Sequence, residues 1–377
     1  MPPRWFTMVE KDPQRRALRV AATAGNEAEA ELMRQRLAEA GILATSQRSI
    51  GGPEWGASGT RYVYVEAPEV ERAREILNAS ADLSKGELTR LSEERLLTLD
   101  VYISNYKPVP SAVPDWPESW QATWPATTCT LISGERDAVL VDSLLTMKES
   151  EELAKWLRSR GKNLTEVYIT HAHGDHFFGL NSVLEAFPNA KPVALAEIVP
   201  LLEEQTVPEW MEIWRGFFPD QLTDRPIAPG PLKNSELRIE SHTLKVTKMG
   251  QSDVADSTLI HIPELDAVLA GDAVYNNIHP WMYQSDHAQR MAWVDTLNQI
   301  EELAPTTIIA GHKDPHAPDD DAARTLQATR QYIRDFDAVV AGSKSGAETV
   351  SAMTEKHPDL GNPYTLWLAA YTQPYDG

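Results

Sequence analysis

Apolar residues follow two alternating patterns along residues 17–79. Short apolar runs alternate with stretches in which apolar side chains recur every three or four residues. The first pattern is typical of strands and the second of amphipathic helices. Asn26 can cap a helix and Gly41 can end one. The region therefore predicts a small βαββα unit, with strands at 17–23, 42–46 and 62–65 and helices at 26–41 and 69–77.

From residue 101 onward, apolar runs of strand length alternate with longer segments of helical periodicity. The predicted strands lie at 130–133, 138–142, 166–170, 191–195, 237–246, 258–262, 267–270 and 307–310. The predicted helices lie at 149–160, 179–187, 198–217, 286–303 and 320–340. This mixed alternation favours an α/β sandwich over a helical bundle or an all-β barrel.

The segment between these two regions is polar, charged and without an aromatic residue, and is interpreted as a linker. The predicted organisation is a tail at 1–16, an accessory domain at 17–79, a linker at 80–98, a larger domain at 99–340 and a helical extension at 341–377. The apolar side chains of the extension would pack on the larger domain or in a homodimer interface. The sequence leaves both arrangements open.

Charge separates the two regions. The 377 residues carry a formal net charge of -20, yet residues 1–90 hold 13 Lys+Arg and 13 Asp+Glu, so the whole acidic excess lies beyond them. An acidic surface repels phosphate backbones and anionic lipids, which argues against nucleic acid and membrane partners and favours a small-molecule substrate. The single cysteine, Cys129, and a start without an apolar signal core indicate a cytoplasmic protein.

Four potential metal ligands lie within six residues after the predicted strand at 166–170. They are His171, His173, Asp175 and His176. Imidazole and carboxylate groups at this density are what a divalent metal site requires. Alternation at the strand end lets His171 and His173 point the same way, and the turn at Gly174 directs the next two ligands to a second position. The run therefore predicts a divalent metal site.

This run resembles the His-x-His-x-Asp-His signature of the metallo-β-lactamase fold superfamily, and the resemblance covers roughly residues 100–340. Three further positions match in order and spacing: Asp142 at a strand end, Asp272 after Gly271, and His312 after Gly311. In the family pattern, these positions support the metal loop, bridge the two metals and supply the last ligand. The resemblance implies an α/β fold, a metallo-β-lactamase-like αββα sandwich.

One position departs from the family pattern. Gln251 stands in the turn where the family usually has a histidine. The resemblance implies two metal positions that share Asp272, with ligands His171, His173 and Gln251 in one and Asp175, His176 and His312 in the other. Because a Gln carbonyl oxygen is a poorer zinc ligand than imidazole, Gln251 is expected to bind weakly or to lie behind the ligands. One or two divalent ions are expected, zinc foremost, with iron or manganese as alternatives.

The resemblance implies a hydrolase in which Asp175 orients or deprotonates a water molecule and Asp272 bridges the metals. The predicted substrate-binding residues are His279, Trp281, Tyr283, Trp210 and Trp214. These aromatic residues would line an apolar pocket for a small ester, lactone or amide, or the Trp210 stripe would pack on the domain. Two alternatives on the same scaffold are a metal- or ligand-binding sensor and an iron-dependent oxygenase.

The accessory domain resembles a second family. Its last helix contains the sequence VERAREIL at 70–77, which is similar to the final helix of a small bacterial domain of unknown function that is often described as signal-transducing. This resemblance implies an architecture and no chemistry.

Overall fold

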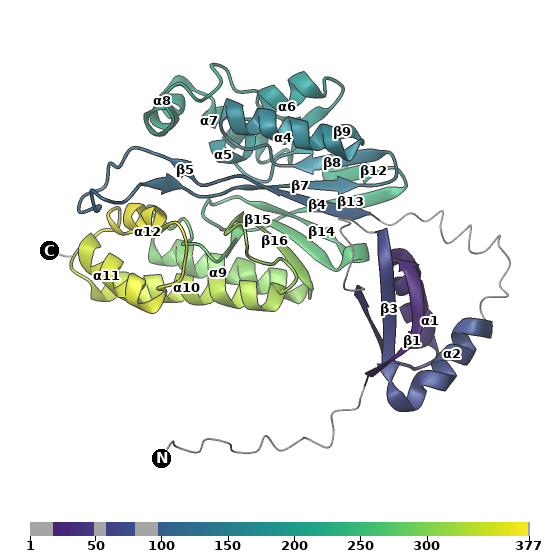
Figure 1. The fold of residues 1–377 in the computed structure, drawn as a ribbon. Helices are drawn as coiled ribbons and strands as arrows, with labels where there is room; N and C mark the ends of the chain where they lie inside the picture. Colours follow the sequence, from purple (N-terminus) through teal and green to yellow (C-terminus); the bar gives the residue numbers. More distant parts are fainter. Residues whose placement is uncertain (1–17, 49–57, 80–96, 376–377) are drawn as a thin grey trace, which may run out of the picture. The chain divides into compact units, whose positions relative to one another are not determined.

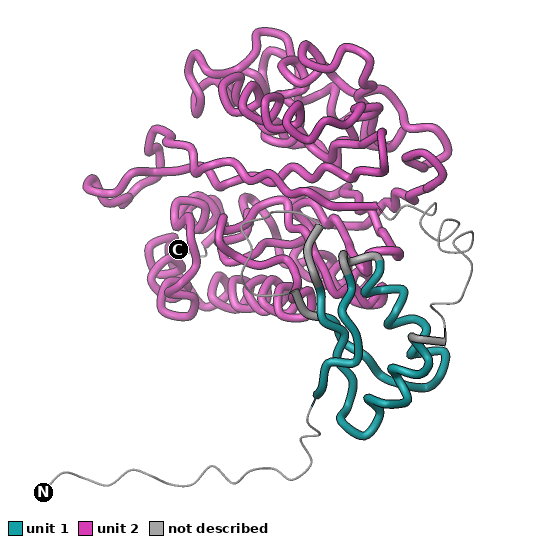
Figure 2. The backbone as a smooth tube through the Cα atoms, turned by 45° about the vertical axis from the view of Figure 1, so that its right-hand side comes forward, with its two compact units in different colours: residues 1–96 teal, residues 97–377 magenta. Residues whose placement is uncertain are grey.

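The computed structural model describes residues 18–48, 58–79 and 97–375. The chain divides into two compact units, residues 1–96 and 97–377 (Figure 2). The predicted tail at 1–16, and the predicted linker up to residue 96, lie outside the described residues. Across the described ranges, no helix combines the length and the apolar character needed to cross a bilayer.

The first unit has the predicted βαββα order. Its elements are β1 (Leu18–Asn26), α1 (Glu27–Glu39), β2 (Ala44–Arg48), β3 (Ser58–Glu66), η1 (Ala67–Glu69) and α2 (Val70–Ala79). The three strands form an antiparallel sheet in the order β1-β3-β2. Buried residues of β3 and both helices, including Val63, Leu37 and Ala73, give this unit a core of its own.

The second unit contains two larger sheets. One has the order β11-β10-β9-β8-β7-β4 and the other the order β12-β13-β14-β15-β16. The strands of the first are β4 (Thr98–Ile103), β7 (Thr128–Ser133), β8 (Asp137–Val141), β9 (Asn163–Tyr168), β10 (Lys191–Ala194) and β11 (Gly230–Pro231). The strands of the second are β12 (Glu236–Ile239), β13 (His242–Lys248), β14 (Thr258–Ile262), β15 (Ala267–Asn276) and β16 (Thr307–Lys313). A short pair, β5 (Lys107–Pro108) and β6 (Thr123–Trp124), lies beside them.

Helices cover the outer sides of the two sheets, which makes the predicted αββα sandwich (Figure 1). On the side of the six-stranded sheet lie α4 (Met147–Arg160), α5 (Gly174–Phe177), α6 (Leu180–Ala186), α7 (Val199–Gln205) and α8 (Pro208–Phe217). On the other side lie α9 (His287–Glu302), α10 (Ala322–Gly342), α11 (Gly346–Lys356) and α12 (Pro363–Ala370). Short 3-10 turns are η2 (Lys233–Ser235) and η3 (Pro263–Leu265). Apolar side chains of both sheets share one core, as Leu131 and Val246 illustrate.

Several predicted elements differ from the structure. The predicted helix at 198–217 is two helices, because Pro208 cannot continue the backbone hydrogen bonds of α7 and instead begins α8. The predicted strand at 237–246 is a hairpin that turns at Glu240, whose φ is 56°. The strands predicted at 267–270 and 307–310 extend further and include Asp272 and His312.

The C-terminal helices pack on the second unit. In α12, Tyr364, Leu366 and Leu368 are buried, and the ring centroid of Trp367 lies 5.2 Å from that of Trp116. These contacts agree with the packing alternative stated for the extension. A homodimer remains a prediction.

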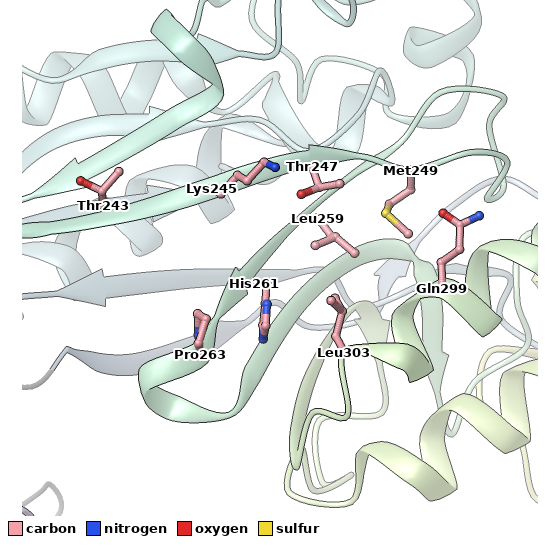
Figure 3. A pocket seen from close by; sticks show the side chains of 9 residues that line it. All are labelled: Thr243, Lys245, Thr247, Met249, Leu259, His261, Pro263, Gln299 and Leu303. Atoms are coloured by element: carbon pink, nitrogen blue, oxygen red, sulfur yellow. The ribbon is translucent and has the colours of Figure 1, made fainter.

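A surface cavity of about 450 Å³ lies on the outer face of β13 and β14, beside the end of α9 (Figure 3). Its lining residues are Thr243, Lys245, Thr247, Met249, Leu259, His261, Pro263, Gln299 and Leu303. None of the predicted metal ligands is among them, so this cavity is separate from the metal centre.

Candidate metal centre

Three parts of the fold bring the predicted ligands together. His171 and His173 lie between the end of β9 and the start of α5, and Asp175 and His176 lie in α5. Asp272 lies in β15 directly after Gly271, whose φ of 51° is in the left-handed region, and the pairing of β15 with β16 shifts register there. Since β15 and β16 are parallel neighbours, His312 lies close to Asp272.

The side chains form two groups. Within each group, the potential metal-ligand atoms lie within 4.8 Å of one another. One group is His171, His173, Asp253 and Asp272, and the other is Asp175, His176 and His312. Asp272 contacts both. Its Oδ1 lies 3.3 Å from His176 Nε2, and its Oδ2 lies 3.5 Å from His171 Nε2 and 3.2 Å from His312 Nε2. The carboxylate is therefore placed to bridge two ions.

Polar residues behind the histidines fix the direction of their rings. Asp142 Oδ2 lies 2.8 Å from His176 Nδ1, and its other oxygen accepts from the Thr170 backbone N–H at 2.9 Å. The Nδ1 of His312 lies 3.0 Å from the carbonyl oxygen of Ala126. In both rings the Nε2 atom is left facing the centre, which is the arrangement that supporting residues give to metal-binding histidines. Asp142 thus occupies the supporting position expected of it.

The buried charges of the centre shift one another's pKa values. Burial alone would raise the pKa of Asp175, but the imidazoles of His176 and His312 hold it well below its usual range. Burial lowers the pKa of His312, but Asp272 and Asp175 outweigh this effect and raise it to about 9. Both carboxylates therefore stay ionised, and the raised pKa values of His176 and His312 mean that these two rings hold protons near neutral pH when no metal is bound.

Metal affinity should consequently rise with pH. A bound ion requires neutral imidazole, and the pKa of His312 is raised to about 9, so binding must displace its proton at any lower pH. We expect competition titrations against a chelating dye to give tighter binding at each step from pH 6 toward pH 9. An affinity that does not change over this range would contradict the expectation.

Two buried atoms indicate that a cation fits the centre. Among the described residues, His176 Nε2 and Asp272 Oδ1 are buried and lie 3.3 Å apart, yet neither makes a hydrogen bond of acceptable geometry. Burying such polar atoms without a partner is costly, and both are donor atoms that divalent ions accept. The two groups therefore have the chemistry of a two-metal site.

Gly311 provides the space for the bridging carboxylate. A Cβ atom built there would lie 1.9 Å from Asp272 Oδ1. We expect Gly311→Ala to displace Asp272 and to lower metal content measured by inductively coupled plasma mass spectrometry. Gly342→Ala is the matched control, because a Cβ atom there meets nothing within 4 Å. Equal metal content in the two variants would show that this close approach is unimportant.

The weak or supporting role expected of Gln251 stays a prediction. Its amide Nε2 donates to the carbonyl oxygen of Ser252 at 2.9 Å. The group beside the first two histidines is Asp253, whose Oδ2 lies 3.0 Å from His173 Nδ1 and whose side chain has no exposed surface. The turn thus brings Asp253, two positions after Gln251, into the centre, although Asp253 was not among the predicted ligands. The signal available in the sequence was that Asp253 lies two residues after Gln251, the position at which the family usually has a histidine.

A pair of alanine variants distinguishes the contribution of Asp253 to metal binding from that of Gln251. Asp253→Ala should weaken metal binding at the first position about 10- to 100-fold, as the loss of a ligand or a close supporting group does. Gln251→Ala should leave binding unchanged. Isothermal titration with Zn²⁺ measures both. A loss in Gln251→Ala with none in Asp253→Ala would support the role expected of Gln251 instead.

The predicted substrate-binding aromatics fall into different environments. Trp214 is buried at 7 % exposure, whereas Trp210 on the same helix is 39 % exposed. Trp281 is half-buried, with its ring 5.1 Å from Trp124, and it stacks at 5.2 Å on Tyr283, which is 38 % exposed. Trp281 and Tyr283 are thus accessible, while Trp214 belongs largely to the core.

His279 lies in a different environment from the one expected. It is buried, its Nδ1 lies 2.9 Å from the Tyr332 hydroxyl oxygen, and its backbone N–H donates to the carbonyl oxygen of Gly361. Burial lowers its pKa to about 3, so the ring is neutral. These contacts lead to α10 and the C-terminal segment rather than to the metal ligands, so we assign His279 no role in the pocket.

Two aromatic residues that were not among the predicted site residues also contact the carboxylates of the centre. The indole Nε1 of Trp124 donates to Asp175 Oδ2 at 2.8 Å. The hydroxyl of Tyr275 donates to Asp272 Oδ2 at 3.2 Å and lies 3.5 Å from Asp253 Oδ2. Both come from segments far from the histidine run, and nothing local in the sequence distinguishes them from core aromatics.

Comparison with known proteins identifies the class. The sequence profile of the metallo-beta-lactamase superfamily matches residues 122–312, half of the chain. The chain belongs to the metallo-β-lactamase superfamily, which confirms the resemblance indicated by the histidine run.

Two solved structures are similar to this chain. A beta-lactamase domain protein from Burkholderia ambifaria has a TM-score of 0.50 and 15% identity, covering 70% of this chain and 83% of its own. A metallo-beta-lactamase family protein from Thermus thermophilus has a TM-score of 0.49 and 20% identity, covering 72% and 91%. At these identities the likeness concerns the fold alone.

A curated relative also matches part of the chain. It is the uncharacterized protein YobT of Bacillus subtilis (strain 168), which is 34% identical over 76 residues, 19% of this chain. The chain spans about a third of the length of this relative, 32%.

Proposed function

We propose that this protein is a metal-dependent hydrolase that acts on a small, partly apolar ester, lactone or amide. The observation that carries the proposal is the pair of buried donor groups joined by Asp272, with His176 Nε2 and Asp272 Oδ1 left without hydrogen-bond partners. With Asp272 shared, each position offers two imidazoles and two carboxylates, a set that suits zinc and also manganese or iron. Superfamily membership supports the same reaction class.

When bound, a divalent ion lowers the pKa of a water molecule toward neutrality and polarises a carbonyl oxygen. The chain supplies the rest of the chemistry. Asp175 stays ionised, because His176 and His312 hold its pKa well below the usual range, so it can accept a hydrogen bond from water and orient it. Trp281 and Tyr283 offer apolar surface to the substrate.

We propose that the protein is cytoplasmic and has no nucleic-acid or membrane partner. The buried thiol of Cys129 is unpaired, as in proteins of reducing compartments. The acidic excess beyond residue 90 disfavours phosphate-rich substrates. The sensor alternative is motivated by Gln251 in place of the usual histidine, and the carboxylate of Asp253 beside His173 weakens that motive.

Metal restoration tests the proposal. The full chain is stripped with a chelator, reloaded with Zn²⁺, Mn²⁺ or Fe²⁺, and tested on nitrophenyl esters, lactones and β-lactams. We expect reloading to restore hydrolysis of at least one of these classes, and His176→Ala to abolish it. Metal-loaded protein that hydrolyses none of them would favour the sensor, and oxygen consumption with Fe²⁺ would favour the oxygenase.

A further inference from the structure

Trp124 contacts both the metal centre and a group of aromatic side chains, here called the aromatic wall, that consists of Trp214, Phe217, Phe218 and Trp281. Its indole N–H donates to Asp175 Oδ2 at 2.8 Å, and the side chain is 6 % exposed. Four aromatic rings lie with their centroids 5.1 to 5.8 Å from its own: Trp281, Trp214, Phe217 and Phe218. A single buried side chain therefore touches both the carboxylate and the wall.

The hydrogen bond restricts how Asp175 can turn. An indole N–H is only a donor, and a buried donor is costly to leave without an acceptor. The same oxygen, Asp175 Oδ2, lies 3.3 Å from His312 Nε2. Trp124 and His312 thus approach one oxygen of the carboxylate, and the packed rings around Trp124 keep its N–H from moving away.

We propose that Trp124 is a positioning residue that holds Asp175 in its working orientation, and that the wall it anchors binds a flat apolar group of the substrate. This inference rests on the proposed hydrolase function. Trp281 and Phe217 are both packed on Trp124 and partly accessible, and Trp281 also stacks on the exposed ring of Tyr283. A substrate ring stacked on Trp281 would lie one ring away from the indole that holds Asp175. The preferred substrates are therefore esters, lactones or amides that carry an aromatic ring.

Metal binding tests the positioning role independently of activity. Trp124→Phe keeps an aromatic ring and loses the N–H. Trp116→Phe is the matched control, because its buried indole N–H also makes one hydrogen bond, to the carbonyl oxygen of Trp120 at 2.9 Å. With Co²⁺ as the probe, we expect the equivalent bound by Asp175, His176 and His312 to bind about 10- to 100-fold more weakly to Trp124→Phe than to wild type. Its visible absorption band should also change. Trp116→Phe should match wild type, and equal binding by the two variants would overturn the positioning role.

Kinetics test the substrate class. Phenyl-bearing and methyl-bearing esters of the same leaving group are compared. Trp124→Phe should lower kcat for both alike, whereas Trp281→Ala should raise KM for the phenyl-bearing ester alone. An unchanged preference between the esters in Trp281→Ala would overturn the assignment of the wall.

A second replacement removes the risk of misfolding. If Trp124→Phe is insoluble, benzothienylalanine introduced at position 124 keeps the two-ring shape and lacks the N–H, so the Co²⁺ titration can be repeated. Wild-type protein that binds no metal or hydrolyses nothing would defeat the proposed function. Active, metal-loaded wild type alongside an unaffected position-124 variant would defeat this inference alone.

Discussion

Replacing Asp272 by Asn should empty both metal positions and lower hydrolysis roughly 1000-fold, because a bound ion supplies several kcal/mol of transition-state stabilisation. The carboxylate is buried, and its two oxygens face His176 on one side and His171 and His312 on the other. Asparagine keeps the shape and loses the charge. Metal content and hydrolysis are measured on the same preparation.

The control for this variant lies on the turn that precedes the same strand. Asp266 is exposed and has a φ of 47°, a conformation that asparagine also adopts readily. Asp266→Asn should therefore retain metal and activity. Full metal content in Asp272→Asn would mean that the carboxylate is not a shared ligand.

Removing the metal should destabilise residues 97–377 by about 4 kcal/mol under conditions in which free metal exceeds its dissociation constant about 1000-fold. For a domain of this size, that corresponds to a melting temperature lower by roughly 10 °C. The cause is the crowding of Asp175, Asp253 and Asp272 around a few imidazoles, where a divalent ion offsets buried negative charge. Calorimetry of the full chain with and without a chelator measures the shift.

The first unit provides an internal reference for that measurement. Its core, which includes Val63 and Leu37, is separate from the cores of residues 97–377. Its transition should not respond to the chelator. A large domain that melts at the same temperature with and without metal would contradict the expectation, as would an equal shift in Asp272→Asn.

The sequence predicted the features that are local. The run from His171 to His176 places four ligands in six residues, and the structure brings them together with Asp272 and His312. The α/β alternation followed from apolar periodicity, and the αββα arrangement from the resemblance that the histidine run carries. Where a single residue changes the local backbone, as Pro208 does between α7 and α8, the pattern of apolar residues gave the wrong boundary.

The features that escaped prediction depend on tertiary contacts. The family pattern pointed to Gln251, but the path of the loop between β13 and β14 directs Asp253 into the centre. Trp124 lies about 50 positions before Asp175, so only the folded chain reveals the hydrogen bond between them. His279 follows the bridging residue closely in sequence, yet β15 carries it away toward Tyr332. Sequence distance and spacing cannot distinguish these cases.

The most direct test of the account is an anomalous difference map from crystals of the full chain grown with Zn²⁺. The account predicts two peaks, one among His171, His173 and Asp253 and one among Asp175, His176 and His312, with Asp272 in contact with both. A map without a peak at this centre, or with its only peaks elsewhere on the chain, would contradict it.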